Sequence, residues 1–129
     1  MSAVHAAEAL RRRTKALALD IVRTVRLLPR TRECDVIARQ VIRSSMSVAA
    51  NYRAVCRCRS RAEFVSKMNV TLEEADETLF WLEAIEELEI AKTRILQAEC
   101  GGLVRIFAAS LRTARRRTAS MEPSASVPP

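Results

Sequence analysis

Ser60-Arg61-Ala62-Glu63 opens the stretch that decides the fold, SRAEFVSKMNVTLEEADETLFWLEAIEELEI at residues 60–90. Ser and Glu at this spacing form a capping box, in which the two side chains satisfy free backbone amides at the start of a helix. Apolar residues then recur every three or four positions, which is the period of an amphipathic helix. The residues expected to face inward are Phe64, Met68, Leu72, Ala75, Leu79 and Leu82. We therefore predict a helix over about residues 61–90.

The same period predicts three more helices, over about residues 3–28, 33–57 and 94–117. Pro29 ends the first helix, and Thr93 is a plausible N-cap of the last. Four amphipathic helices with short links indicate one all-α domain, an antiparallel up-down-up-down four-helix bundle. The remaining residues, 118–129, are rich in Ser, Pro and Ala and are expected to form a disordered tail.

Several classes of protein do not fit this composition. The four cysteines show no metal-ligand spacing, and the single histidine, His5, lies near the start of the chain. No phosphate-cradling glycine loop and no nucleophile-histidine arrangement is present, so we expect neither an enzyme nor a bound cofactor or metal. The chain also lacks a signal-peptide pattern and an apolar run of membrane length. A soluble cytoplasmic protein with free thiols is expected.

Charge is segregated along the chain, whose formal net charge is +7. Residues 1–61 hold 14 Lys and Arg against 4 Asp and Glu, residues 62–92 hold 2 against 9, and residues 93–129 hold 6 against 2. Basic surfaces attract polyanions, and an acidic face beside a basic one suits self-association. The bases are 19 Arg and 3 Lys, which fits phosphate binding and equally fits an arginine-rich codon bias.

The second predicted helix carries a basic face opposite its apolar stripe. Its arginines fall within roughly 80° of one another, with Met46 and Ala50 between them. The predicted nucleic-acid contacts on this helix and the following turn are Arg39, Arg43, Arg53, Arg57, Arg59 and Arg61, with support from Arg12, Arg23 and Arg26 on the first helix. Tyr52 is expected to face the core, so binding should use phosphates rather than stacked bases. The alternative is that these arginines are only the solvated faces of amphipathic helices.

The third predicted helix is acidic on its outer surface. Phe80 is expected to point outward among the carboxylates, with Trp81 on the flank, and exposed aromatic residues in a charged face indicate a subunit or partner contact. The expected interface residues are Met46, Phe80, Trp81, Glu73 and Glu77. The alternative is a boundary position that a neighbouring helix covers. Glu73 and Glu77 share a face as carboxylate metal ligands do, but no inward-pointing Glu-x-x-His unit accompanies them.

Residues 37–88 resemble the four-helix-bundle family named for proteins encoded in intervening sequences of bacterial 23S ribosomal RNA genes. The residues that carry the resemblance are Arg39-Gln40-Val41-Ile42-Arg43-Ser44-Ser45, Ser47-Val48-Ala49-Ala50-Asn51, Phe64, Glu73-Glu74-Ala75-Asp76-Glu77 and Trp81-Leu82-Glu83. The commoner family pattern continues after Asn51 with Ile-Ala-Glu-Gly, whereas this chain has Tyr52-Arg53-Ala54-Val55, which looks like the branch carrying Asn-Tyr-Arg.

The resemblance implies an antiparallel bundle that assembles as a homopentamer. It also implies nucleic-acid binding, because the related accessory variability determinant of diversity-generating retroelements is a basic bundle that works with a reverse transcriptase and its RNA. We therefore expect a non-enzymatic oligomer that binds the backbone of RNA, or of DNA. Its expected protein partner is a reverse transcriptase or another nucleic-acid enzyme. The alternative is a protein-interaction scaffold that docks a partner on the acidic face of the third helix or at Met46.

Overall fold

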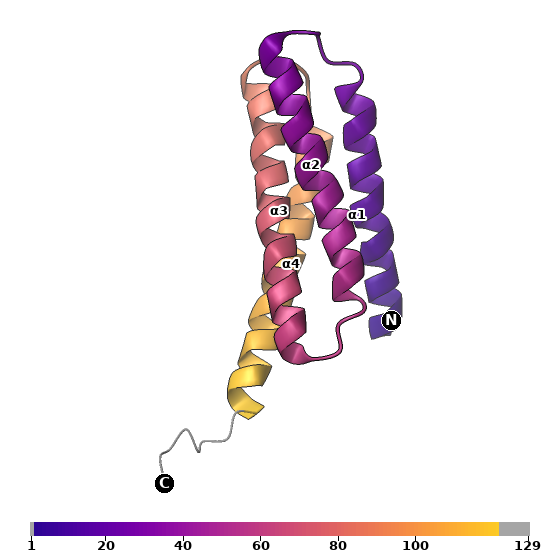
Figure 1. The fold of residues 1–129 in the computed structure, drawn as a ribbon, viewed down its shortest axis with the longest axis vertical. Helices are drawn as coiled ribbons and strands as arrows, with labels where there is room; N and C mark the ends of the chain where they lie inside the picture. The colour runs from indigo at the N-terminus through magenta and orange to yellow at the C-terminus, as the bar shows by residue number, and fades with distance from the viewer. Residues whose placement is uncertain (1, 122–129) are drawn as a thin grey trace.

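A computed structural model describes residues 2–121 of the chain, with side chains for residues 2–117. It contains four helices, α1 (Ala3–Val25), α2 (Arg32–Val55), α3 (Arg61–Glu87) and α4 (Arg94–Met121), and no strand within those residues. Each helix runs antiparallel to the next (Figure 1). The predicted all-α four-helix bundle is confirmed.

The start of α3 is set by the capping box expected from the sequence. The Ser60 hydroxyl accepts a hydrogen bond from the Glu63 amide at 3.1 Å. The Glu63 carboxylate reaches back to the amide of Arg59 at 3.5 Å, one residue earlier than the usual reciprocal bond of such a box. Thr31 caps α2 in the same way, through a 3.2 Å bond from the Cys34 amide.

The α3 helix ends at Glu87, three residues earlier than predicted. Glu89 adopts a φ of 60°, in the left-handed region. The Ile90 amide then bonds to the Ile85 carbonyl at 3.0 Å, and the Glu89 amide bonds to the Glu86 carbonyl at 2.9 Å. This pattern is a Schellman motif, which usually carries Gly at the left-handed position. Because Glu occupies that position here, the sequence gives no sign of the helix end.

The α4 helix runs to Met121, four residues beyond the predicted end. Residues 118–121 contain no Gly or Pro, and the first proline after them is Pro123. Since the residue before a proline disfavours helical geometry, a helix can continue up to this point. The first four residues of the predicted tail are therefore helical, and the rest of it, residues 122–129, lies outside the described residues.

The core lies along the inner stripes of all four helices. Tyr52 is buried, as predicted, and stacks on Phe107 with ring centroids 5.5 Å apart. Burial raises the pKa of Tyr52 to about 12. The core also contains buried hydroxyl groups, which the apolar stripes did not predict. An example is Thr78 of α3, whose hydroxyl donates a 2.8 Å hydrogen bond to the Ser44 hydroxyl of α2. The four cysteines are free thiols.

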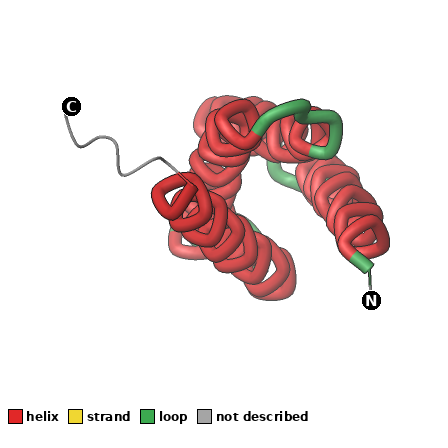
Figure 2. The backbone as a smooth tube through the Cα atoms, turned by 90° about the horizontal axis from the view of Figure 1, so that it is seen from below, coloured by secondary structure: helices red, strands yellow, loops and turns green. Residues whose placement is uncertain are grey.

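The four helices do not close the bundle evenly. The α3 helix packs extensively against α2 and α4, and α1 packs mainly on α2. Seen along the bundle axis, α1 and α4 are the two ends of an open arc (Figure 2). They meet over a short stretch, where the Arg13 guanidinium binds the Glu99 carboxylate in a two-point contact at 2.8 and 3.0 Å.

Candidate nucleic-acid interface

The alternating direction of the helices gathers basic residues at one end of the bundle. This end contains the start of α1, the end of α2, the start of α3 and the end of α4, and it is the lower end in Figure 1. The half of the described chain nearer to it, residues 3–14, 44–74 and 107–117, holds 12 Lys and Arg against 4 Asp and Glu. The opposite half, residues 15–43 and 75–106, holds 10 against 10. We call the first region the basic end.

Five of the predicted contacts lie at the basic end, four of them on α2, the following turn and the start of α3. Arg53, Arg57 and Arg59 are exposed, whereas Arg61 is half-buried. A shallow groove of about 690 Å³ runs between the end of α2 and the turn before α3, and it is lined by Ala50, Arg53, Ala54, Arg57, Arg59 and Glu63. The groove therefore presents three guanidinium groups beside one carboxylate, a surface that could follow a phosphate backbone.

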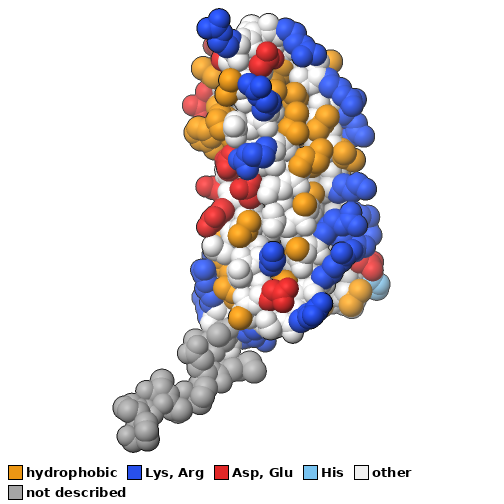
Figure 3. Space-filling model, viewed as in Figure 1, with side chains coloured by type: hydrophobic (Ala, Val, Ile, Leu, Met, Phe, Trp, Pro, Cys, Tyr) orange, Lys and Arg blue, Asp and Glu red, His pale blue; other side chains and the backbone are white. Residues whose placement is uncertain are grey.

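The other predicted contacts on α1 and α2 are spread along the bundle. Arg12 lies at the basic end, whereas Arg23, Arg26 and Arg39 lie in the opposite half. Arg23 forms an exposed ion pair with Asp20 at 2.8 Å. On the face formed by α1 and α2, Lys and Arg side chains flank a strip of hydrophobic side chains (Figure 3). The structure thus brings only part of the predicted set into one surface.

Arg43 forms ion pairs with the neighbouring helix at the bundle surface. Its guanidinium binds Glu74 at 3.0 Å and also binds Glu77, so that it joins α2 to α3. The bond to Glu77 is the main cause of a raised Arg43 pKa. The Glu77 pKa is lowered by hydrogen bonds from the Trp81 indole and from Arg43. Two carboxylates therefore balance the charge of Arg43, which makes it the weakest candidate of the predicted set for a phosphate contact.

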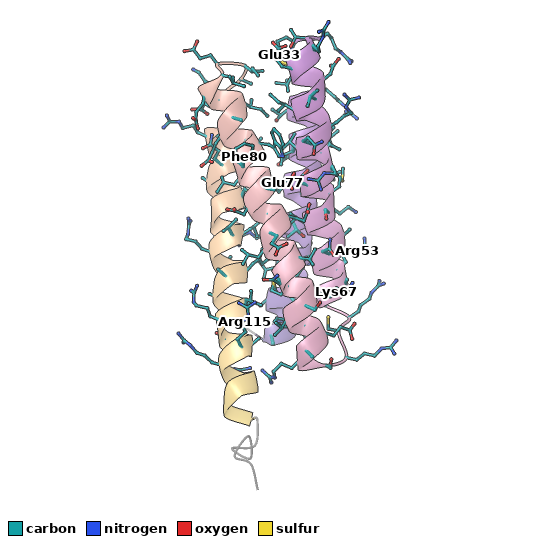
Figure 4. All side chains as sticks on the ribbon, turned by 60° about the vertical axis from the view of Figure 1, so that its left-hand side comes forward. Glu33, Arg53, Lys67, Glu77, Phe80 and Arg115 are labelled. Atoms are coloured by element: carbon teal, nitrogen blue, oxygen red, sulfur yellow. The ribbon has the colours of Figure 1, made fainter. Side chains whose placement is uncertain are left out.

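The end of α4 supplies cations that the sequence analysis did not select. Four exposed arginines crowd its last described turns, at positions 112, 115, 116 and 117. Arg115 lies within 3.5 Å of the Asn69 side-chain oxygen on α3. Figure 4 shows Arg53, Lys67 and Arg115 on three different helices in the lower half of the bundle. The run of three arginines was visible in the sequence, but only the up-down order of the helices shows that it lies at the same end as Arg53 and Arg57.

The predicted interface aromatics lie on the opposite half, on the outer side of α3. Phe80 is 56% exposed and meets the Trp81 ring edge-on at a centroid distance of 4.9 Å. Trp81 is half-buried, and its indole N–H donates to the Glu77 carboxylate at 3.0 Å. Glu73 is exposed, and it accepts a hydrogen bond from the Asn69 amide at 3.0 Å. Phe80 and Glu77 are labelled in Figure 4.

Met46 does not belong to this aromatic cluster. It lies on the outer face of α2, between the arginines of that helix, and is 38% exposed. The five predicted interface residues therefore lie on two separate surfaces, one acidic and aromatic on α3 and one basic and apolar on α2.

The acidic face does not assemble a metal site within the described part of the chain, where no three His, Cys, Asp or Glu side chains are placed to share an ion. Among the described helices, none is both long enough and apolar enough to cross a bilayer.

Comparisons with known proteins agree with this architecture. The model of the 23S rRNA-intervening sequence protein family matches residues 9–107. A crystal structure from Bacteroides thetaiotaomicron, of a protein with unknown function from the S23 ribosomal protein family, superimposes with a TM-score of 0.74 and 25% sequence identity. The superposition covers 82% of this chain and 97% of that one. None of the curated proteins compared with the chain matches it. Since the family model spans α1, α2, α3 and half of α4, the chain belongs to the 23S rRNA-intervening sequence protein family.

Proposed function

We propose that this protein is a non-enzymatic, cytoplasmic nucleic-acid-binding protein that contacts the phosphate backbone of RNA in preference to DNA. The observation that carries the proposal is the basic end, where cations from four helices meet with few carboxylates among them. Its central residues are Arg53, Arg57 and Arg59 on α2 and the following turn. The preference for RNA is supported by the superimposed structure, which comes from the S23 ribosomal protein family.

Arginine is suited to this role, because its planar guanidinium group can donate two parallel hydrogen bonds to one phosphate. Contacts of this kind give affinity without reading the base sequence. They also release counterions, so the affinity falls steeply as the salt concentration rises.

The test is a titration of mixed-sequence RNA and duplex DNA at about 50 and 200 mM salt, where phosphate-driven affinity differs by orders of magnitude. The test variant is Arg53→Glu/Arg57→Glu at the basic end. The matched control is Arg30→Glu/Arg32→Glu, which makes the same change in net charge on exposed residues at the opposite end. We expect the test variant to bind more than about tenfold more weakly. The slope of its log affinity against log salt concentration should be shallower by about two units, one for each arginine replaced. The control variant should bind with an affinity close to that of the wild type.

Two results would overturn this proposal. The first is an absence of binding by the wild-type protein at the lower salt concentration. The second is an equal loss of affinity in both variants, because it would reflect net charge alone. Circular dichroism of each variant shows that the helices are intact.

A second candidate function is self-association, which the exposed Phe80 favours. A phenylalanine that is 56% exposed within an acidic helix face leaves apolar surface in water. The acidic face of α3 is complementary in charge to the basic end, so a second copy of the chain is a fitting partner, and the family resemblance implies a pentamer. Light scattering should show an oligomer that Phe80→Ser weakens and that shifts toward monomer between low and high salt. A monomer at every salt concentration would reject it.

A further inference from the structure

The basic end contains a second hollow, separate from the groove beside Arg53. It has a volume of about 640 Å³ and lies between the turn that joins α2 to α3 and the far part of α4. Its apolar wall includes Val55, Phe64 and Ala114, and its polar rim includes three arginines and the hydroxyls of Ser110 and Thr113.

The three arginines reach this hollow from three parts of the chain: Arg59 from the turn, Arg61 from the first residue of α3, and Arg117 from α4. No acidic side chain is among the described residues that line it. The nearest carboxylate in sequence, Glu63, lines the neighbouring groove and bonds to the Arg59 backbone amide. Within the described side chains, the guanidinium groups of Arg59 and Arg61 pair with no carboxylate. Their charge is therefore available to an anion.

The lining of the hollow distinguishes it from the groove beside Arg53. That groove has two alanines and no aromatic side chain, so it offers contacts to phosphates but no ring on which a base could stack. A concave site with an aromatic ring and small apolar side chains on one wall can hold a flat base, and cations on its rim can hold the attached phosphate. A base within a duplex is stacked and paired, so only an unpaired nucleotide could enter.

We propose that this hollow binds one unpaired nucleotide of the nucleic acid that the basic end contacts. Phe64, Ala109 and Ala114 receive the base, and Arg59 and Arg61 receive the phosphate. This inference rests on the proposed function, and it adds a preference for nucleic acids with an unpaired end or bulge. Such a preference is absent from a surface that binds phosphates alone.

The first experiment compares a blunt RNA duplex with a duplex that carries a short unpaired overhang and has the same number of phosphates. The wild type should bind the overhang duplex about tenfold more tightly, which is the size expected for stacking one base on one aromatic ring. Phe64→Leu keeps an apolar side chain but removes the ring, so it should abolish this preference and leave the blunt-duplex affinity unchanged. Arg61→Gln should reduce the preference, whereas the control Arg39→Gln, at an exposed position in the opposite half, should keep it.

A second experiment tests the hollow without any nucleic-acid duplex. Cys58 lines the hollow, whereas Cys56 is exposed outside it, so the two thiols form an internal reporter pair. Alkylation is followed by mass spectrometry in the presence of 5′-AMP, adenosine or inorganic phosphate. We expect 5′-AMP to slow the alkylation of Cys58 several-fold and to leave Cys56 unaffected.

The outcomes separate the two proposals. Equal affinity of the wild type for both duplexes, with no protection of Cys58, overturns the nucleotide site and leaves backbone binding intact. Protection by inorganic phosphate as strong as that by 5′-AMP overturns the assignment of a base to the hollow. If neither duplex binds, the proposed function fails, and protection of Cys58 by 5′-AMP then decides the nucleotide site by itself.

Discussion

Thr93 shows how much one side chain can hold together in this bundle. It is 1% exposed and lies at the junction of α3 and α4. Its hydroxyl donates to the Leu82 carbonyl at 2.6 Å and accepts from the Gln97 amide at 3.0 Å, while its backbone N–H donates to the Glu86 carboxylate at 2.8 Å. Thr93 directly precedes α4, at the position of the predicted N-cap, and its hydroxyl also ties the new helix to the one before it.

Thr93→Val is therefore expected to destabilise the protein by about 1–3 kcal/mol, because valine cannot make the two hydrogen bonds of the buried hydroxyl, to the Leu82 carbonyl and from Gln97. Thr113→Val, at an exposed position of α4, is the control and should change the free energy of unfolding by less than about 0.5 kcal/mol. Urea denaturation measures both. Equal losses in the two variants would mean that the Thr93 bonds contribute little to stability.

Glu77 should make the free energy of unfolding depend on pH under acidic conditions. Because Trp81 and Arg43 lower its pKa in the folded state, ionised Glu77 stabilises the fold above the unfolded-state pKa of about 4.3. The contribution disappears as the pH falls through the lower folded-state pKa. Glu77→Gln should thus be less stable than the wild type at neutral pH, and the difference should shrink as the pH falls through the lowered folded-state pKa of Glu77. Thermal unfolding at a series of pH values checks this, and a constant difference would contradict it.

At the scale of the element, α4 continues through Gly101 and Gly102, although glycine is unfavourable inside a helix. A Cβ atom added at either position would meet only the ends of the Arg13 and Arg105 side chains, at 3.6 Å or more. Nothing within the described chain therefore requires glycine there. The double variant Gly101→Ala/Gly102→Ala should be more stable by about 1 kcal/mol per substitution, since glycine is that much less favourable than alanine inside a helix.

Calorimetry tests this prediction, with Ala109→Gly on the same helix as the control that should lose a similar amount. A double variant that is no more stable than the wild type would show that α4 needs its glycines. If the variant is stable but loses self-association, the glycines allow a second copy to approach closely.

Most of the fold could be predicted at this scale, because the period of the apolar residues reflects packing within each helix. The predicted inward stripe of α3 is an example, since Met68, Ala75 and Leu82 are buried and the other predicted residues of the stripe pack against the core. The helix ends were less predictable, because the end of α3 depends on the left-handed backbone of Glu89 and not on a residue type that marks such a turn.

At the scale of the whole molecule, charge repulsion at the basic end should weaken the fold at low salt. Screening removes this repulsion, so the melting temperature should rise by about 4 °C between roughly 20 and 300 mM salt. Arg115→Gln/Arg116→Gln removes two exposed cations from the end of α4. The variant should melt at a higher temperature than the wild type at low salt and at the same temperature at high salt. A melting temperature that is independent of salt in both proteins would refute the argument.

The candidate site could be predicted only in part, because it is assembled by topology. Arg53 and Arg57 could be predicted to share an outer face, because the helical period of a single helix places them there. The arginines of α4 become their neighbours only when the chain has reversed direction three times. Arg43 has the same periodicity as Arg53, yet its partners, Glu74 and Glu77, lie on the next helix, 31 and 34 residues away in sequence.

The uneven closure of the bundle also has a consequence for the order in which the chain folds during synthesis. The α1 helix leaves the ribosome first and can pair at once with α2, whereas Glu99, which binds Arg13, follows 86 residues later. The contact between α1 and α4 therefore cannot form until α4 has begun to be synthesised. Until α3 and α4 pack against them, the first two helices of the nascent chain expose part of their inner stripes, and this is the interval in which a chaperone would find a binding site.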